Sequence, residues 1–138
     1  MKVGIYPVVA DVLHTGHLLS IEEAKKNCDY LIVCLHCNPN YKNPIQTIYE
    51  RFMQLRAVKW IDEIIPYQDK EDAATLIRSL NYDVYFLGED HKGRDWENRE
   101  LVESLGKEII YLPRQHDFSS TNLKIRIVDS EMNFHEKG

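Results

Sequence analysis

The stretch at residues 3–27 reads VGIYPVVADVLHTGHLLSIEEAKKN and contains the clearest pattern of secondary structure in the chain. Its first part, residues 3–9, is short, apolar and rich in β-branched side chains, which is typical of a buried strand. Residues 17–27 place apolar side chains at the spacing of one helix face. A strand that continues through a short loop into such a helix forms the first half of a βαβ unit, so this stretch predicts a parallel sheet.

The same alternation of strand and helix continues along the chain. Further apolar strands are expected at residues 30–35, 63–67, 84–87 and 108–112. Helices are expected at residues 49–60, 70–80, about 98–105 and 119–128, the last capped by Ser119 or Ser120. Because right-handed crossovers place helices on both faces, the predicted fold class is α/β, a Rossmann-like five-stranded parallel sheet with helices on both faces. This domain spans residues 1–128, and residues 129–138 are expected to form a polar C-terminal tail, loose from about Glu131.

Composition and charge limit the class of protein. The 138 residues, 43% hydrophobic and 28% charged, suffice for one globular domain. No apolar run approaches the ~18 residues that span a bilayer, and residues 2–10 lack the basic flank and cleavage site of a signal peptide. We therefore expect a soluble, cytoplasmic protein without a membrane segment. The net charge of −5 argues against a nucleic-acid partner, but it leaves room for a small phosphorylated ligand in a local basic pocket.

Three cysteines occur in the chain, Cys28, Cys34 and Cys37. An odd number without a signal peptide indicates reduced thiols. The segment CLHC at residues 34–37 resembles a metal or redox pair, but no second pair completes a set of four ligands. We expect buried or loop thiols and no metal site built from protein side chains.

The loop after the first strand carries the strongest chemical signal, His14-Thr15-Gly16-His17. His17 is expected to open the helix, where unpaired backbone N–H groups form a binding site for phosphate. Gly16 allows a ligand to approach the backbone closely. The two imidazoles can donate hydrogen bonds to phosphate oxygens. Alternatively they are metal ligands, for which Asp11 is the third candidate.

A second helix start carries a matching signal. Arg114 follows the last strand, and Ser119, Ser120 and Thr121 stand at the beginning of the last helix. Hydroxyls, free backbone amides and a guanidinium all suit phosphate oxygens. Alone, this would be an N-cap beside a surface arginine. Two such helix starts, after the first and last strands, predict a local positive pocket on an otherwise acidic surface.

These two segments carry a family resemblance. HTGH at residues 14–17 and FSSTNLK at residues 118–124 resemble the HxGH and SSTxxK-type motifs of the nucleotidyltransferase superfamily. With YLPR at residues 111–114, YER at 49–51 and WIDEIIP at 60–66, the chain is similar to the glycerol-3-phosphate cytidylyltransferase family over residues 1–128.

The resemblance implies a reaction. An enzyme of this family joins a nucleoside triphosphate, most simply CTP, to a small phosphomonoester such as glycerol 3-phosphate, giving a CDP-linked product and pyrophosphate. ATP with another phosphorylated acceptor stays open, as does a nucleotide-binding module without turnover. The resemblance also implies a homodimer, and Mg²⁺ bound mainly through the nucleotide phosphates rather than by protein ligands.

The resemblance further implies the roles of single residues. The catalytic set would be His14 and His17 on the triphosphate, Lys42 from a loop, and Arg114 from the opposite side. The implied nucleotide-binding set is Val9, Ala10, Asp11, His14, Gly16, His17, Lys42, Gly88, Asp90, Arg114, Ser119, Ser120 and Thr121.

The chain departs from the family where the acceptor is expected. Residues 8–10, VVA, replace a Gly-(Thr/Ser)-Phe segment, although Asp11 matches. Lys59 stands for a helix arginine, Gln115 for a threonine, and the lysine near the acceptor has no aligned counterpart. These differences leave the reaction class intact and make the identity of the acceptor the least determined part of the prediction.

Overall fold

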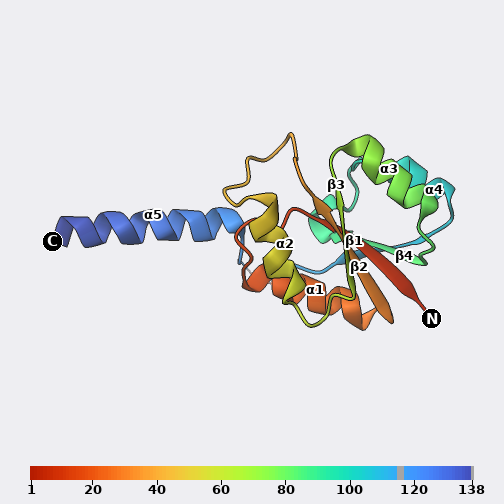
Figure 1. Cartoon of the computed structure of the whole chain (residues 1–138), viewed down its shortest axis with the longest axis horizontal. Coiled ribbons are helices and arrows are strands. Elements are labelled where there is room, and N and C mark those ends of the chain that lie inside the picture. The colour runs from red at the N-terminus through yellow and green to blue at the C-terminus, as the bar shows by residue number, and fades with distance from the viewer. Residues whose placement is uncertain (115–116, 138) are drawn as a thin grey trace.

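A five-stranded sheet forms the centre of the computed structural model, which describes residues 1–114 and 117–137 (Figure 1). The strands are β1 (Val3–Val8), β2 (Tyr30–His36), β3 (Glu63–Tyr67), β4 (Val84–Gly88) and β5 (Glu108–Leu112). All neighbouring strands are parallel, in the order β3-β2-β1-β4-β5. The predicted fold class is therefore confirmed, and each strand ends within one residue of its expected bounds.

Helices cover both faces of this sheet. On one face, α1 (Thr15–Lys26) and α2 (Ile48–Arg56) bury side chains such as Ile21 and Leu55. On the other face, α3 (Lys70–Ser79) and α4 (Arg99–Ser104) bury Ile77 and Val102. The short η1 (Glu89–His91) follows β4, and α5 (Ser120–Lys137) follows β5. Because both faces are covered, β2 is apolar along most of its length and shows no alternation with polar residues.

The order of the strands fixes where a ligand can bind. The chain adds β2 and β3 on one side of β1 and then returns to add β4 and β5 on the other side. In open parallel sheets, such a reversal leaves a crevice beyond the carboxyl ends of the two strands that flank it. Here those strands are β1 and β4, and the loops that begin after Val8 and Gly88 open into the crevice.

Two helix boundaries differ from the expectation. α1 begins at Thr15 with His14 as its N-cap, so His17 is the third helical residue and does not open the helix. α2 ends at Arg56, which leaves Lys59 outside the helix with its ammonium 5.1 Å from the centre of the Trp60 ring. In both cases the shift is a few residues, which is the usual uncertainty of boundaries read from periodicity.

The expectation of a loose C-terminal segment is wrong. α5 runs as one helix from Ser120 through Lys137. Residues 120–137 contain neither Gly nor Pro, so nothing in the sequence ends the helix once it has begun. The polarity that suggested looseness is that of a solvent-exposed helix. No helix of the described chain is long and apolar enough to cross a lipid bilayer.

Candidate active site

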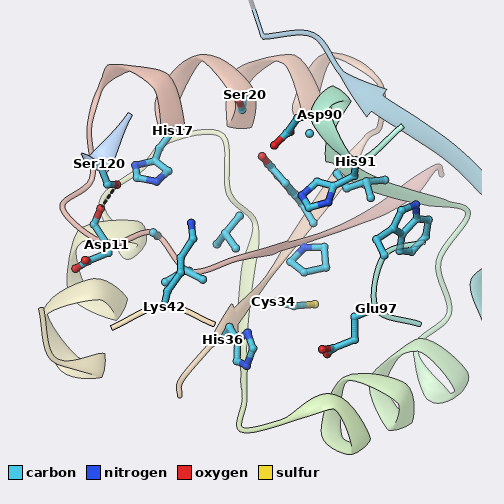
Figure 2. Close-up of a pocket in the computed structure, with 18 of the residues that line it drawn as sticks. Asp11, His17, Ser20, Cys34, His36, Lys42, Asp90, His91, Glu97 and Ser120 are labelled. Carbon is cyan, nitrogen blue, oxygen red and sulfur yellow. Dashed lines mark hydrogen bonds between the residues drawn. The ribbon is translucent and has the colours of Figure 1, made fainter. Parts of the chain in front are cut away.

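A cleft of about 1060 Å³ opens at the carboxyl ends of the strands (Figure 2). Loops after β1, β2, β4 and β5 line it, together with the first turns of α1 and α5. The structure brings every residue of the implied nucleotide-binding set to this cleft: Val9, Ala10, Asp11, His14, Gly16, His17, Lys42, Gly88, Asp90, Arg114, Ser119, Ser120 and Thr121. Their individual roles stay predictions.

His14 and His17 form a capping box at the start of α1. His14 Nδ1 accepts a hydrogen bond from the Gly16 N–H at 3.0 Å, and His17 Nδ1 accepts one from the His14 N–H at 3.2 Å. The ring centres lie 3.9 Å apart. Since a neutral imidazole that accepts through Nδ1 carries its proton on Nε2, this capping box assigns both rings the same tautomer.

His17 remains uncharged near neutral pH. Burial first, and then electrostatic interactions with His14 and Lys42, lower the pKa of His17 to about 3, against an opposing effect of Asp11. An Nε2–H donor that stays neutral can bind a phosphate oxygen without gaining or losing a proton. Figure 2 shows Lys42 reaching into the cleft on the side of His17, so a cation and a neutral donor face the same space.

Asp11 connects three segments that are distant in sequence. Its buried carboxylate accepts hydrogen bonds from the N–H groups of Ile45 and Gln46, each at 3.0 Å, and from Lys124 Nζ at 2.7 Å. Burial raises the pKa of Asp11, but the hydrogen bonds from Lys124, Gln46 and Ile45 outweigh it and leave the pKa below its usual value. Asp11 is therefore an ionised anchor whose oxygens are occupied, which disfavours the alternative that it joins the histidines on a metal. The described residues contain no group of three or more potential metal ligands.

The backbone around Asp11 is strained. Ala10 and Val12, on either side of it, have φ values of 56° and 51°. The left-handed region costs about 1–2 kcal/mol for a residue with a Cβ. The Val12 N–H donates to Gln46 Oε1 at 2.7 Å, which helps to hold this conformation. Strain of this kind persists where surrounding contacts fix it, often at functional sites.

The start of α5 agrees with the expected N-cap, and it shows one contact that the sequence did not predict. Ser119 Oγ accepts from the Asn122 N–H at 3.0 Å, so Ser119 is the N-cap. Ser120 Oγ donates to the backbone oxygen of Asp11 at 2.6 Å and is committed to that contact. Thr121 is exposed at the cleft. Arg114 is also exposed, and its N–H donates to Glu89 Oε1 at 2.8 Å. Gln115, singled out from the sequence, lies outside the described residues.

Gly88 and Asp90 form the wall after β4. A Cβ at residue 88 would lie 2.7 Å from Asp90 Oδ1, so only glycine lets this carboxylate fold back over the end of the strand. Asp90 and Ser20 of α1 both line the cleft, and Figure 2 labels both of them.

Sequence reasoning missed the role of Arg51, which is only 2% exposed. Its Nη1 donates to the backbone oxygens of Val9 and His36 at 3.0 and 2.8 Å, and Nη2 donates to that of Cys37 at 2.7 Å. One guanidinium thus ties the loop after β1 to the end of β2. The available signal was the segment YER at residues 49–51, which served only for the resemblance.

Sequence reasoning also missed an aromatic wall on the side of α3. His36 stacks on Tyr67 with ring centres 4.6 Å apart, and Tyr85 stacks on Trp96 at 5.2 Å. Cys34 lies in the floor of the cleft. Burial is the main reason that the pKa of its thiol is raised to about 12, so this thiol is not a nucleophile. The described thiols are free, as expected for a reduced protein.

Charge is distributed unevenly along the cleft. The described cationic side chains that line it are Lys42, Arg114 and Lys124. Glu97 lines the other end, across the cleft from Asp11 and His17 in Figure 2. The predicted positive pocket is therefore one end of a longer cleft whose far end is aromatic and acidic.

Comparison with known proteins gives a consistent result. A family model described as cytidylyltransferase-like matches residues 5–126. The glycerol-3-phosphate cytidylyltransferase of Bacillus subtilis is 31% identical over 121 residues, covering 85% of this chain and 90% of that protein. The FAD synthase of Ferroglobus placidus is 34% identical over 136 residues, covering 93% and 89%.

Two further matches differ in length and in kind. The bifunctional protein HldE of Hyphomonas neptunium is 30% identical over 132 residues, but these are 27% of its length. The crystal structure of a lipopolysaccharide core biosynthesis protein from Thermoplasma volcanium superposes with a TM-score of 0.71 at 26% identity, covering 84% of this chain and 99% of that one. The family model and these relatives show that the chain belongs to the cytidylyltransferase-like family, and its cleft agrees with this. The chain is a nucleotidyltransferase.

Proposed function

We propose that this nucleotidyltransferase condenses CTP with a small phosphomonoester, glycerol 3-phosphate or a close analogue, and releases pyrophosphate. The observation that carries the proposal is the junction at Asp11, where Ser120 and Lys124 bind the residue that leads into the HTGH loop. This junction holds two helix starts at one end of one cleft. Similarity to the Bacillus subtilis cytidylyltransferase over 90% of its length supports CTP and this acceptor.

The residues suit an in-line transfer. An oxygen of the acceptor phosphate forms a bond to the α-phosphorus of the nucleotide, and the bond to the leaving pyrophosphate breaks. A phosphomonoester is ionised near pH 7, so the reaction needs no side-chain base. The chain's part is to position both reactants and to stabilise charge on the α-phosphate oxygens, with the Nε2–H of His17 and the ammonium of Lys42.

Mg²⁺ fits this scheme as an ion that accompanies the nucleotide. The oxygens of Asp11 already accept hydrogen bonds from two backbone N–H groups and a lysine. In this scheme the carboxylate is therefore not a metal ligand. Phosphate oxygens and water are the ligands that Mg²⁺ prefers when protein carboxylates are few. Bound to the nucleotide, the ion would neutralise part of the phosphate charge. His17 and Lys42 would bind phosphate oxygens that do not coordinate the ion.

A second candidate is an adenylyl transfer from ATP to another phosphorylated acceptor. It is favoured by the similarity to the Ferroglobus placidus FAD synthase, which covers 93% of this chain. The aromatic wall formed by the His36–Tyr67 and Tyr85–Trp96 pairs offers more apolar surface than glycerol needs.

One assay separates these candidates. The full chain is incubated with Mg²⁺, one of four nucleoside triphosphates and one of a panel of phosphomonoesters, and pyrophosphate is measured. We expect release with CTP and glycerol 3-phosphate. Release with ATP and none with CTP contradicts the nucleotide assignment. Nucleotide binding by calorimetry without pyrophosphate release from any pair contradicts the proposed reaction.

A further inference from the structure

The far end of the cleft carries an acidic side chain that the proposed reaction does not use. Glu97 follows the buried Trp96 on the segment between η1 and α4, and it is exposed where it lines the cleft. Figure 2 shows its carboxylate turned toward the side on which His36 lies. Among the described residues, none forms a hydrogen bond or an ion pair with this carboxylate. Glu97 is therefore available to a ligand that enters the cleft.

Aromatic side chains from other segments surround Glu97. The Tyr41 ring, on the loop after β2, is 63% exposed and has its centre 5.9 Å from that of His36. Burial first, and then the charge of Glu97, raise the pKa of Tyr41. Burial also raises the pKa of Tyr67, and Glu97 is one of the smaller causes that act in the same direction. Both phenols stay protonated, so they add ring surface and hydroxyl groups beside Glu97 and no second charge.

No side chain of the described lining offsets the charge of Glu97. Its lysines and arginine are Lys42, Arg114 and Lys124, and none of them pairs with Glu97, since Lys124 binds Asp11. The nearby imidazole of His36 does not supply a positive charge at neutral pH. Burial lowers its pKa, and Glu97 opposes this effect without reversing it. This end of the cleft is therefore negative, whereas Lys42 lies on the side of His17.

We propose that this end binds the alcohol part of the acceptor, and that the acceptor carries an ammonium group that contacts Glu97. The inference rests on the proposed function, because it assigns the phosphate of the acceptor to the end of the cleft with His17 and Lys42. The acceptor is then the phosphate ester of an amino alcohol, an analogue of glycerol 3-phosphate with an ammonium in place of a hydroxyl. The ammonium takes no part in the transfer and only orients the acceptor.

The charge at this end favours an ammonium over a hydroxyl. A hydroxyl can donate a hydrogen bond to Glu97 but leaves the negative charge in place, whereas an ammonium donates and also neutralises it. The aromatic side chains exclude water on one side, which strengthens the attraction between opposite charges. A phosphate at one end and an ammonium at the other match the two ends of the cleft, and the reversed orientation would place like charges together.

The first test compares acceptors of equal length. The compounds 3-aminopropyl phosphate and 3-hydroxypropyl phosphate differ only in the group at the far end, and 2-aminoethyl and 2-hydroxyethyl phosphate form a shorter pair. Glycerol 3-phosphate joins them as the polyol. Pyrophosphate release is measured with Mg²⁺ and the nucleoside triphosphate that gives the highest rate. We expect kcat/KM of the better amino phosphate to exceed that of its hydroxy partner about tenfold, because hydrogen bonds between charged groups are the stronger ones.

Variants of the full chain test where the ammonium binds. Glu97→Gln keeps the size of the side chain and removes its charge, so the ratio of kcat/KM between amino and hydroxy phosphate should fall close to one. Glu100→Gln is the matched control, because Glu100 is an exposed glutamate three residues later that does not line the cleft. This variant should keep the wild-type ratio. Circular dichroism checks that both variants fold.

Binding separates this inference from the proposed reaction. The same phosphates are titrated calorimetrically into the wild type and Glu97→Gln without a nucleoside triphosphate. Tighter binding of the amino phosphate that Glu97→Gln abolishes supports the ammonium site, even if no pair releases pyrophosphate and the reaction is overturned. Pyrophosphate release with equal use of both phosphates, or with a preference for the hydroxy phosphates or glycerol 3-phosphate, overturns the ammonium site and leaves the reaction standing.

Two further outcomes also count against the inference. An amino preference that persists in Glu97→Gln overturns the assignment of the ammonium to Glu97. Neither binding nor release with any of these phosphates overturns both the ammonium site and the proposed reaction.

Discussion

The two helix starts at the cleft are built in different ways. The start of α1 is local: His14 and His17, three residues apart, satisfy each other's backbone groups. The start of α5 is fixed by a residue that is distant in sequence. Asp11 contacts Ser120 and Lys124, which follow it in the chain by 109 and 113 positions. In the proposed reaction, the local start supplies the imidazole donors, whereas the distant contacts fix where the second helix start lies. Substitutions at the first should therefore affect turnover, and those at the second should affect nucleotide binding.

The largest effect is expected for the local start. In the proposed reaction, His17→Ala removes a neutral hydrogen-bond donor to the charged α-phosphate oxygens. We expect kcat to fall about 100-fold or more, as for a lost transition-state donor. Steady-state pyrophosphate release measures it. His135→Ala, on the exposed part of α5, is the control and should keep wild-type turnover. A His17→Ala enzyme with unchanged kcat would remove this histidine from the mechanism.

The second effect is a loss of stability in acid. His17 is neutral in the folded chain, with a pKa of about 3, whereas the unfolded chain takes up a proton near pH 6.5. The stability that neutral His17 contributes is fully present above the pKa of this histidine in the unfolded chain. This contribution is lost as the pH drops from about 6.5 toward 3. By pH 5 the wild type should lose up to about 2 kcal/mol of unfolding free energy from this group.

Urea denaturation at several pH values checks this expectation. His17→Gln has no such proton and should lose less stability between pH 7 and pH 5 than the wild type. Equal losses in the two proteins would mean that His17 is not buried neutral.

A smaller effect is expected for the distant contacts. Lys124→Met leaves the buried Asp11 carboxylate without its cation and should weaken nucleotide binding about tenfold, with a smaller change in kcat. Calorimetric titration with CTP and with ATP measures it. Lys26→Met breaks an exposed pair with Glu22 and should change nothing, since surface pairs contribute little. A Lys124→Met protein that binds normally but turns over 100-fold more slowly would reverse the contrast between the two starts.

The smallest effect is expected at Ser120. Ser120→Ala removes one hydrogen bond to the Asp11 backbone and should weaken nucleotide binding a few-fold, about 1 kcal/mol. Ser130→Ala, farther along α5, is the control. If Ser120→Ala lowers kcat instead and leaves binding unchanged, the hydroxyl touches the reacting phosphates.

What could be predicted from the sequence follows the same division. The strands, α1 and the histidine pair depend on residues close together in the chain, and their patterns were sufficient. The Lys124–Asp11 contact and the hold of Arg51 on Val9, His36 and Cys37 depend on the packing of distant segments. No spacing rule shows such contacts in one sequence. Polarity also misled at the C-terminus, because a helix that leaves the body has the composition of a loose tail.

The contact between Asp11 and Lys124 has a consequence for how the chain matures. During synthesis, Asp11 and the histidine loop emerge early, while Lys124 is among the last residues of the domain to appear. Among the described residues, the partners of the carboxylate that precede Lys124 in the chain are the N–H groups of Ile45 and Gln46. The end of the cleft at Asp11 is therefore completed late in synthesis, and a chain that stopped before Lys124 would lack this contact. The contact between Asp11 and the start of α5 therefore forms only after the chain has been made beyond Lys124.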